Sequence, residues 1–329
     1  MRSNRSSCGV VLVLFLLGAA PDAFCQVTTP SSSQSGIRDE EMRLYAGAKP
    51  YLDDSIPELE KKVRELKGLK PASGQEHLSD LLHKIGLKVD ELVKKVPDLT
   101  SEENVILIGR NDGQQDCALA HAEGESALPN GCPSTAGLRR QKVFHYLILS
   151  RQTKDGRVLE ELRTDEQNHP VEPGAGGPNF QGMVGSWLFF SPSNRAQSRF
   201  RYLGEQKSGK RQSFVVAFAQ IPGAVNLPMM MTDGGGSIPL LLQGIAWVDQ
   251  EDFRILEIRT DILSPLPAAG WQKQTAKILF GPIGMSQHSL ELWLPIRVDV
   301  SAQVNGLAFQ EQHVYSNYRM FHATSRMLP

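Results

Sequence analysis

Large apolar side chains occupy every second position along several stretches between residue 180 and the C-terminus. In QSFVVAFAQ, residues 212–220, these are Phe214, Val216 and Phe218, with Val and Ala between them. LELWLPIRVDV, residues 290–300, repeats the pattern. Because successive side chains of a strand point to opposite faces, the pattern predicts a twisted antiparallel sheet with one broad apolar face. A helix, a second sheet or a ligand must cover that face.

Eight strands with short connections are predicted in this half of the chain, which favours an up-and-down meander. The predicted strands are 186–190, 199–205, 212–220, 240–249, 253–263, 272–280, 291–302 and 306–321. Upstream, residues 101–112 predict another strand. The stretches QKVFHYLILSRQ and VLEELRT flank an Asp155–Gly156 turn and predict a hairpin.

Two helices precede the strands. The first is expected to start at Ser55–Glu58, with Pro57 in its first turn, and to end at Gly68. The second is expected to start at a capping box, Ser73–Glu76, and to carry an apolar stripe as far as Lys95, although Gly86 weakens it. Its lysines alternate with acidic residues, which favours a solvated outer face over contact with a membrane.

The predicted fold class is therefore α+β, with N-terminal amphipathic helices followed by a large antiparallel sheet. The expected organisation is a signal peptide (1–25), a flexible tether (26–50), a helical segment (51–97) and the sheet (98–329). The sheet region includes a loop at 117–132 and a flexible insertion at 226–237.

The N-terminus predicts export. Arg2 and Arg5 precede a short apolar run at 9–20, followed by a cleavage site after Cys25. The run is too short for a membrane span. A lipid anchor on Cys25 is the alternative, but Phe24 is not the small residue that normally precedes a lipoprotein cysteine. The expected location is periplasmic or secreted.

Cleavage would leave two cysteines, Cys117 and Cys132, which in an exported chain predict a disulfide. His121 and Glu123 lie in the enclosed loop, but a zinc-deaminase site needs two further cysteines with C-x-x-C spacing. No metal site is expected.

The charge balance argues against a nucleic-acid partner, because Lys plus Arg total 35 and Asp plus Glu total 36. The chain also lacks G-x-S-x-G, H-E-x-x-H and P-loop motifs. His288 and His313 are interpreted as strand or turn residues, because no nucleophile or orienting carboxylate is placed beside them in the sequence. We expect a monomer without cofactor or catalytic activity.

The stretches QGIAWVDQEDFRILEIRTD, WLPIRVDV and HVYSNYRMF, taken in this order, resemble late strands of the lipoprotein-carrier superfamily typified by LolA and LolB. The resemblance covers about residues 78–327 and is closest to exported bacterial proteins with an N-terminal helical segment. It implies an unclosed half-barrel whose concave face is covered by helices and binds acyl chains. It assigns no receptor-binding residue to this chain.

Two functional hypotheses follow. In the first, the protein holds an acyl chain or another hydrophobic ligand on the concave face, and Met229, Met230 and Met231 of the insertion form a lid. The alternative is a mobile loop that pins a few methionines into the core. The proposed groove residues are Trp187, Phe200, Tyr202, Phe214, Val216, Phe218, Trp247, Leu292 and Leu294. In the second hypothesis these residues form a filled core, and the protein is a structural or interaction module that binds another envelope protein.

Overall fold

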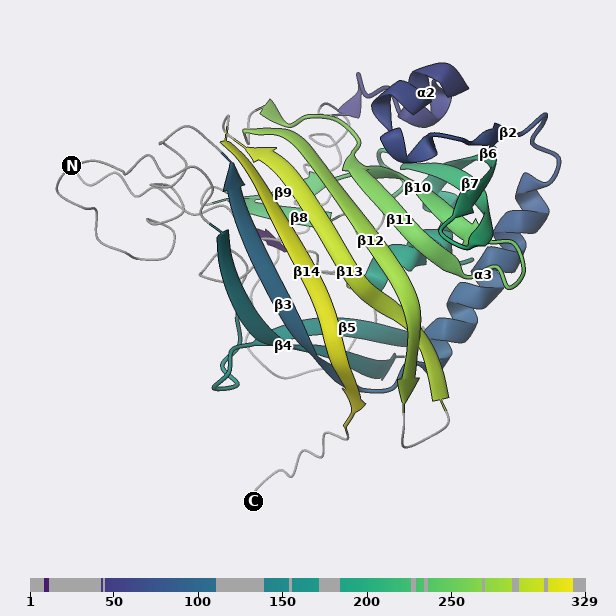
Figure 1. Cartoon of the computed structure of the whole chain (residues 1–329). Coiled ribbons are helices and arrows are strands. Elements are labelled where there is room, and N and C mark those ends of the chain that lie inside the picture. The colour runs from purple at the N-terminus through teal and green to yellow at the C-terminus, as the bar shows by residue number, and fades with distance from the viewer. Residues whose placement is uncertain are drawn as a thin grey trace, which may run out of the picture.

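The computed structural model describes residues 9–11, 43, 45–110, 139–153, 156–171, 184–225, 229–233, 236–267, 270–285, 290–304 and 307–321. Eleven strands form one antiparallel sheet, which does not close into a barrel. Figure 1 shows its long strands curving side by side, with α3 on the right of the view and α2 at the top. The α+β half-barrel predicted from the sequence is confirmed.

The strand order in this sheet is β2-β6-β7-β10-β11-β12-β13-β14-β3-β4-β5. Its bounds are β2 Lys70–Pro71, β3 Leu99–Arg110, β4 Arg139–Thr153, β5 Gly156–Thr164, β6 Ser198–Ser208, β7 Arg211–Gln220, β10 Leu242–Asp249, β11 Ile255–Ile262, β12 Trp271–Met285, β13 Leu290–Val304 and β14 Leu307–Met320. From β6 to β14 the sheet is the predicted meander. The last strand then pairs with β3, so the early β3–β4–β5 unit extends the sheet beyond its C-terminal strand.

A second, small sheet contains β1 (Gly9–Val11), β8 (Met229–Asp233) and β9 (Gly236–Leu240). The predicted flexible insertion (226–237) therefore contains β8 and the first two residues of β9, which pair as a hairpin. The predicted disulfide between Cys117 and Cys132 lies outside the described residues.

Helix α2 (Ile56–Lys62) begins where the sequence predicted. The Glu58 carboxylate accepts hydrogen bonds from the backbone N–H (3.1 Å) and the hydroxyl (2.7 Å) of Ser55. A short 3₁₀ helix, η2 (Arg64–Leu66), follows it. None of the helices in the described part of the chain is both long and apolar enough for a membrane crossing.

Helix α3 (Leu78–Lys95) is unbroken at Gly86. A Cβ at this position would lie 3.2 Å from the carbonyl oxygen of Phe190, so glycine permits close packing of the helix. The capping box predicted at Ser73 is wrong, because the helix begins after His77. The Gln75 side chain instead exchanges two hydrogen bonds with the backbone of Tyr202, each 2.8 Å long.

The strand predicted at 186–190 is also wrong. These residues belong to a 3₁₀ helix, η3 (Val184–Phe190), which contacts α3 and β11. A short run of apolar residues has no periodicity that separates a strand from a buried helical turn. The segment packs against the sheet and is not part of it.

Both faces of the sheet are covered around β7 and β10. We call the face beneath η3 the inner face, which carries Phe214, Val216 and Phe218. The outer face carries Val215, Ala217 and Ala219, and these residues are buried as well. The prediction of a single apolar face was therefore incomplete.

The N-terminal segment covers the outer face. The backbone N–H of Tyr51, in the 3₁₀ helix η1 (Tyr51–Asp53), donates to Gln243 (2.8 Å), and the Gln206 amide donates to the carbonyl oxygens of Glu65 and Lys67. Tyr45 is 2% exposed, and its hydroxyl accepts from the N–H of Leu241 (2.9 Å). The folded part therefore begins before residue 50, the expected end of the tether.

Candidate functional site

The predicted groove residues divide between two environments. Five of them lie on the inner face, because Phe200 pairs with Phe218 and Tyr202 with Val216 across β6 and β7, with Phe214 in the same row. The rings of Phe189 and Phe190 pack on Phe218, with centroid distances of 4.8 and 5.6 Å. This part of the predicted groove is therefore filled by the protein's own aromatic side chains.

Trp247 does not belong to an inner-face groove. It pairs with Val215, which places it on the outer face, and its indole Nε1 donates to Gln206 (2.9 Å). The prediction failed because β10 is buried on both faces, so its sequence has no alternation that distinguishes them.

Leu292 and Leu294 are buried in β13, where a register shift opposite Leu279 and Phe280 interrupts the regular row read from the sequence. The extra residue of this bulge is Ile296, so Leu292 and Leu294 do not share a face with Val298, which pairs with Ile278. Trp187 is buried in η3 and stacks on Phe280 at 5.5 Å. Of the nine predicted residues, Trp187 and Leu292 line the open cleft described next.

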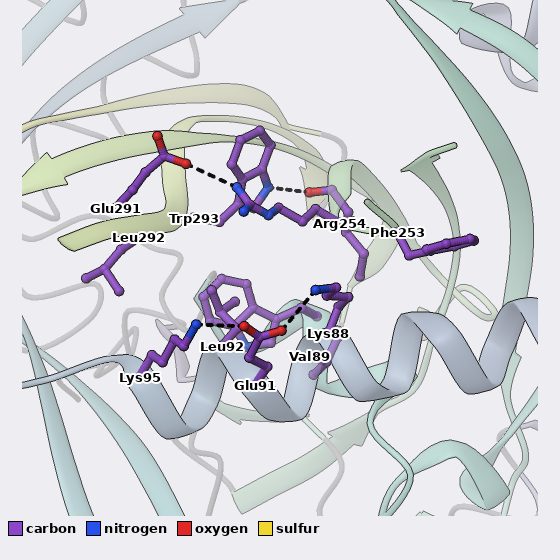
Figure 2. Close-up of a pocket in the computed structure, with 12 residues that line it drawn as sticks. Lys88, Val89, Glu91, Leu92, Lys95, Phe253, Arg254, Glu291, Leu292 and Trp293 are labelled. Atoms are coloured by element: carbon purple, nitrogen blue, oxygen red, sulfur yellow. Dashed lines mark hydrogen bonds and ion pairs between the residues drawn. The ribbon is translucent and has the colours of Figure 1, made fainter. Parts of the chain in front are cut away.

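The cleft lies between α3 and the ends of β11 and β13 (Figure 2). It is lined by Lys88, Val89, Glu91, Leu92 and Lys95 of α3, by Trp187, and by residues 253–255 and 291–293. Its volume is about 70 Å³, and the space beyond is open to solvent. Its lining combines apolar side chains with charged groups.

Charged side chains line the two sides of the cleft without crossing it in the contacts of Figure 2. On α3, the Glu91 carboxylate pairs with Lys88 (3.0 Å) and Lys95 (2.6 Å). Hydrogen bonds from Lys95 and then Lys88 lower the pKa of Glu91 to about 2. On the sheet side, Arg254 pairs with Glu291 (3.3 Å). Each side therefore neutralises part of its own charge, and α3 is not tied to the sheet by these pairs.

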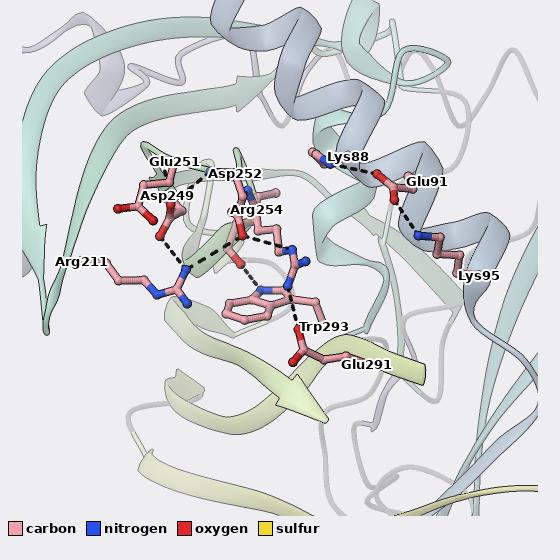
Figure 3. A network of polar contacts seen from close by, with 11 residues as sticks. Lys88, Glu91, Lys95, Arg211, Asp249, Glu251, Asp252, Arg254, Glu291 and Trp293 are labelled. Carbon is pink, nitrogen blue, oxygen red and sulfur yellow. Dashed lines mark hydrogen bonds and ion pairs between the residues drawn. The ribbon is translucent and has the colours of Figure 1, made fainter. Parts of the chain in front are cut away.

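Two guanidinium groups lie against the ring of Trp293, at 5.6 Å for Arg211 and 5.3 Å for Arg254 (Figure 3). Arg211 is held by Asp249 (2.8 Å), and Arg254 by Asp252 (3.2 Å). The indole Nε1 of Trp293 donates to the carbonyl oxygen of Ile255 (2.7 Å). The orientation of this ring is therefore fixed by the turn between β10 and β11.

The same turn places Phe253 at the cleft. Asp249 accepts hydrogen bonds from the backbone N–H groups of Glu251 and Asp252, as expected for an Asx turn. Phe253 has φ of +60°, a left-handed conformation that is unfavourable for a bulky residue. Its ring stacks on Phe214 at 6.1 Å and lies beneath the Lys84 ammonium group at 5.0 Å.

A separate polar cluster lies on the inner face at β14, β3 and β5. Pairing across strands puts Ala246, Ile258, Ile278, Val298, His313 and Val105 in one row. Glu103 is two residues before Val105 on β3 and therefore lies on the same face. It forms an ion pair with Arg163 through two contacts, and the distance from Arg163 Nη2 to Glu103 Oε1 is 2.7 Å. His313 Nδ1 lies 2.9 Å from Glu103 Oε1, and its Nε2 lies 3.4 Å from Glu311.

An orienting carboxylate is therefore present beside His313, contrary to the interpretation made from the sequence. Burial lowers the pKa of His313, but the hydrogen bond with Glu103 and the nearby Glu311 carboxylate outweigh it, and the net pKa is raised. For Glu103 the effects have the opposite sign. Burial raises the pKa of its carboxyl group, but Arg163 and His313 bring that pKa down to about 2. Among the described residues, no group of His, Cys, Asp and Glu side chains is arranged to hold a metal ion.

The sequence contained a partial signal for this cluster. Glu103 alternates in phase with Ser101 and Val105, so it lies on the buried face of β3 together with them. Its partners lie 60 and 210 positions away, and only the register of four strands brings them together. No pattern in the sequence predicts the cleft, because one side of it comes from a helix and the other from two strands that are far away in the chain.

One similar solved structure is described as a putative outer membrane lipoprotein-sorting protein domain from Vibrio parahaemolyticus, with 12% identity, a TM-score of 0.37 and coverage of 74% of this chain and 95% of that one. A LolA superfamily protein from Nitrosomonas europaea has 13% identity, a TM-score of 0.33 and coverage of 75% and 94%.

A DUF1329 family protein from Desulfovibrio piger has 11% identity, a TM-score of 0.35 and coverage of 75% and 94%. The superfamily expected from the strand patterns is thus represented among the structural neighbours. No protein-family model and no curated protein matches the sequence. At these levels of identity, the neighbours assign no role to any residue of this chain.

Proposed function

We propose that the protein is an exported, non-catalytic carrier that holds an acyl chain or another hydrophobic ligand in the cleft between α3 and the sheet. The observation that carries this proposal is the combination of an apolar lining, including Val89, Leu92 and Leu292, with charged groups at the same opening. Ligand pockets are commonly lined by apolar and aromatic side chains with a few polar groups. An amphiphile fits this division, with its chain against the apolar lining and its polar end among the charges.

This proposal narrows the site expected from the sequence. The inner face beneath η3 is filled by aromatic contacts around Phe218. A ligand therefore occupies the space along α3 and does not lie across the whole concave face. The ends of β11 and β13 form the opposite wall.

Export rests on the predicted signal peptide, and the mature chain is the form to test. Native mass spectrometry of protein purified from the periplasm should detect a bound lipid. Titration of delipidated protein with a fluorescent fatty acid should be saturable, with one ligand per chain. Absence of both a co-purified lipid and saturable uptake would reject the carrier.

The alternative, a structural or interaction module, is supported by the filled aromatic region of the inner face. It predicts a monomer that takes up no lipid and that retains a specific envelope protein in a pull-down. The titration therefore separates the two functions directly.

A further inference from the structure

One wall of the cleft carries more positive than negative charge. Helix α3 contributes Lys88, Glu91 and Lys95 to the lining, which is two ammonium groups and one carboxylate. Their side chains are between 41% and 56% exposed, so all three lie at the open part of the cleft. The other two residues that α3 contributes, Val89 and Leu92, are apolar. An apolar surface with a positively charged edge therefore faces the opening.

The two lysines share a single carboxylate. Glu91 Oε2 lies 3.0 Å from the Lys88 ammonium group, and Glu91 Oε1 lies 2.6 Å from that of Lys95. An ammonium group has three N–H donors, so each lysine can bind a second anion or water with the donors that Glu91 does not occupy. Because one negative charge faces two positive charges, the wall can accept one more negative charge.

The opposite wall has no excess of positive charge. Arg254 pairs with Glu291 at the cleft (3.3 Å) and with Asp252 outside the lining (3.2 Å). Neither Lys88 nor Lys95 forms an ion pair with this wall within the described ranges of the chain (Figure 2). A negatively charged group that enters the cleft is therefore attracted to α3 and not to the sheet.

We propose that Lys88 and Lys95 bind an anionic headgroup, a carboxylate or a phosphate at the end of an acyl chain, an inference that rests on the proposed carrier function. The chain lies along Val89 and Leu92, and the headgroup stays at the exposed edge of α3. Glu91 is then an internal competitor, because it occupies both ammonium groups until the headgroup takes over a contact. Exposed ion pairs contribute less than about 1 kcal/mol each, so this exchange is reversible.

The test uses the full mature protein and displacement of the hydrocarbon probe diphenylhexatriene by amphiphiles below their critical micelle concentrations. Dodecanoate and dodecyl phosphate are anionic, monododecanoyl glycerol is neutral and dodecyltrimethylammonium is cationic. The anions should bind about three- to tenfold more tightly than the neutral compound, and the cation more weakly than it. Added salt should reduce this preference, because it screens exposed charges. Acetate and inorganic phosphate, which have the charge without the chain, should displace no probe.

Glu91→Gln should strengthen binding although it removes two ion pairs. The competing carboxylate is lost and both ammonium groups are released, so both anions should bind about threefold more tightly. The double variant Lys88→Gln, Lys95→Gln should bind anionic and neutral amphiphiles equally. Asp80→Asn is the matched control, because Asp80 pairs with Lys84 on the same helix (2.7 Å) but does not line the cleft. It should leave the affinity for the anions at the wild-type value.

Headgroup recognition would be overturned if wild-type protein binds anionic and neutral amphiphiles equally, or if Glu91→Gln binds the anions no more tightly than Asp80→Asn does. Retention of the anion preference by the double lysine variant, or displacement of the probe by acetate or phosphate alone, would also overturn it. If wild-type protein binds neither the probe nor any amphiphile, the carrier function itself fails. Thermal unfolding without ligand is the second measurement. Glu91→Gln should melt slightly below wild type, because it loses two pairs along the helix, so tighter binding cannot come from a more stable helix.

Discussion

Glu103 and Arg163 form an ion pair with two contacts in the interior, and their side chains are 0% and 1% exposed. They lie on β3 and β5, on either side of β4. Removing two charges from water is costly, and their attraction offsets this only when both partners are present. The pair is therefore a point at which a single substitution should have a large effect.

Glu103→Gln should lower the free energy of unfolding by about 3–5 kcal/mol, because it leaves the buried Arg163 charge without its partner. Urea denaturation measures the change. The double variant Glu103→Leu, Arg163→Met removes both charges and should be less destabilised than the single variant. A double variant that is as unstable as the sum of two damaging single variants would contradict this account.

His313 should make stability depend on pH. It faces Glu103 of β3 and Glu311 of its own strand, and its pKa is raised in the folded protein. The folded state therefore binds the proton more tightly than the unfolded state. The resulting stabilisation is fully present below the ordinary histidine pKa of about 6.5 and is lost as pH rises through the raised value.

The measurement is the difference in unfolding free energy between wild type and His313→Gln from acidic to alkaline pH. We expect this difference to shrink as pH rises. A constant or growing difference would show that protonation of His313 does not stabilise the fold.

Gly204→Ala should be strongly destabilising. Gly204 has φ of +139°, and a Cβ there would lie 2.0 Å from the carbonyl oxygen of Lys70, the backbone of β2. Gly209 is the control, because its φ is also positive (+59°) but nothing lies within 4 Å of the added atom. Gly209→Ala should cost about 1–2 kcal/mol for its backbone conformation alone. Equal melting temperatures for the two variants would exclude the steric contribution at Gly204.

At position 253, glycine should be more stable than alanine, which is the reverse of the usual order. Glycine normally destabilises a protein relative to alanine, but Phe253 occupies left-handed backbone geometry. Phe253→Gly should therefore be more stable than Phe253→Ala, by about 1 kcal/mol, although both lose the contact with Phe214. Paired denaturation curves measure this order, and the reverse order would mean that the turn relaxes in the variants.

The sequence predicts the elements of this fold better than its contacts. The stripe of α3 and the alternation around Phe214 follow from periods of 3.6 and 2 residues, which are local properties. The apolar run at Trp187 has no such period, so the sequence predicts a strand where the chain forms η3. Trp247 was placed on the wrong face because both faces of β10 are buried.

The site required information that is not local. The cleft depends on where α3 crosses the ends of β11 and β13, and the burial of Glu103 depends on pairing between β14 and β3. Small outer-face residues such as Ala217 and Ala219 gave a hint that a second layer packs closely there. Nothing in the sequence identified residues 45–72 as that layer.

If the cleft along α3 holds the ligand, a large side chain that fills the cleft should prevent binding. Leu92 lines the cleft, whereas Leu87 of the same helix is 54% exposed and does not. With both variants folded by circular dichroism, Leu92→Trp should abolish saturable binding of a fluorescent fatty acid, and Leu87→Trp should bind as wild type does. Undiminished binding by Leu92→Trp would contradict the claim.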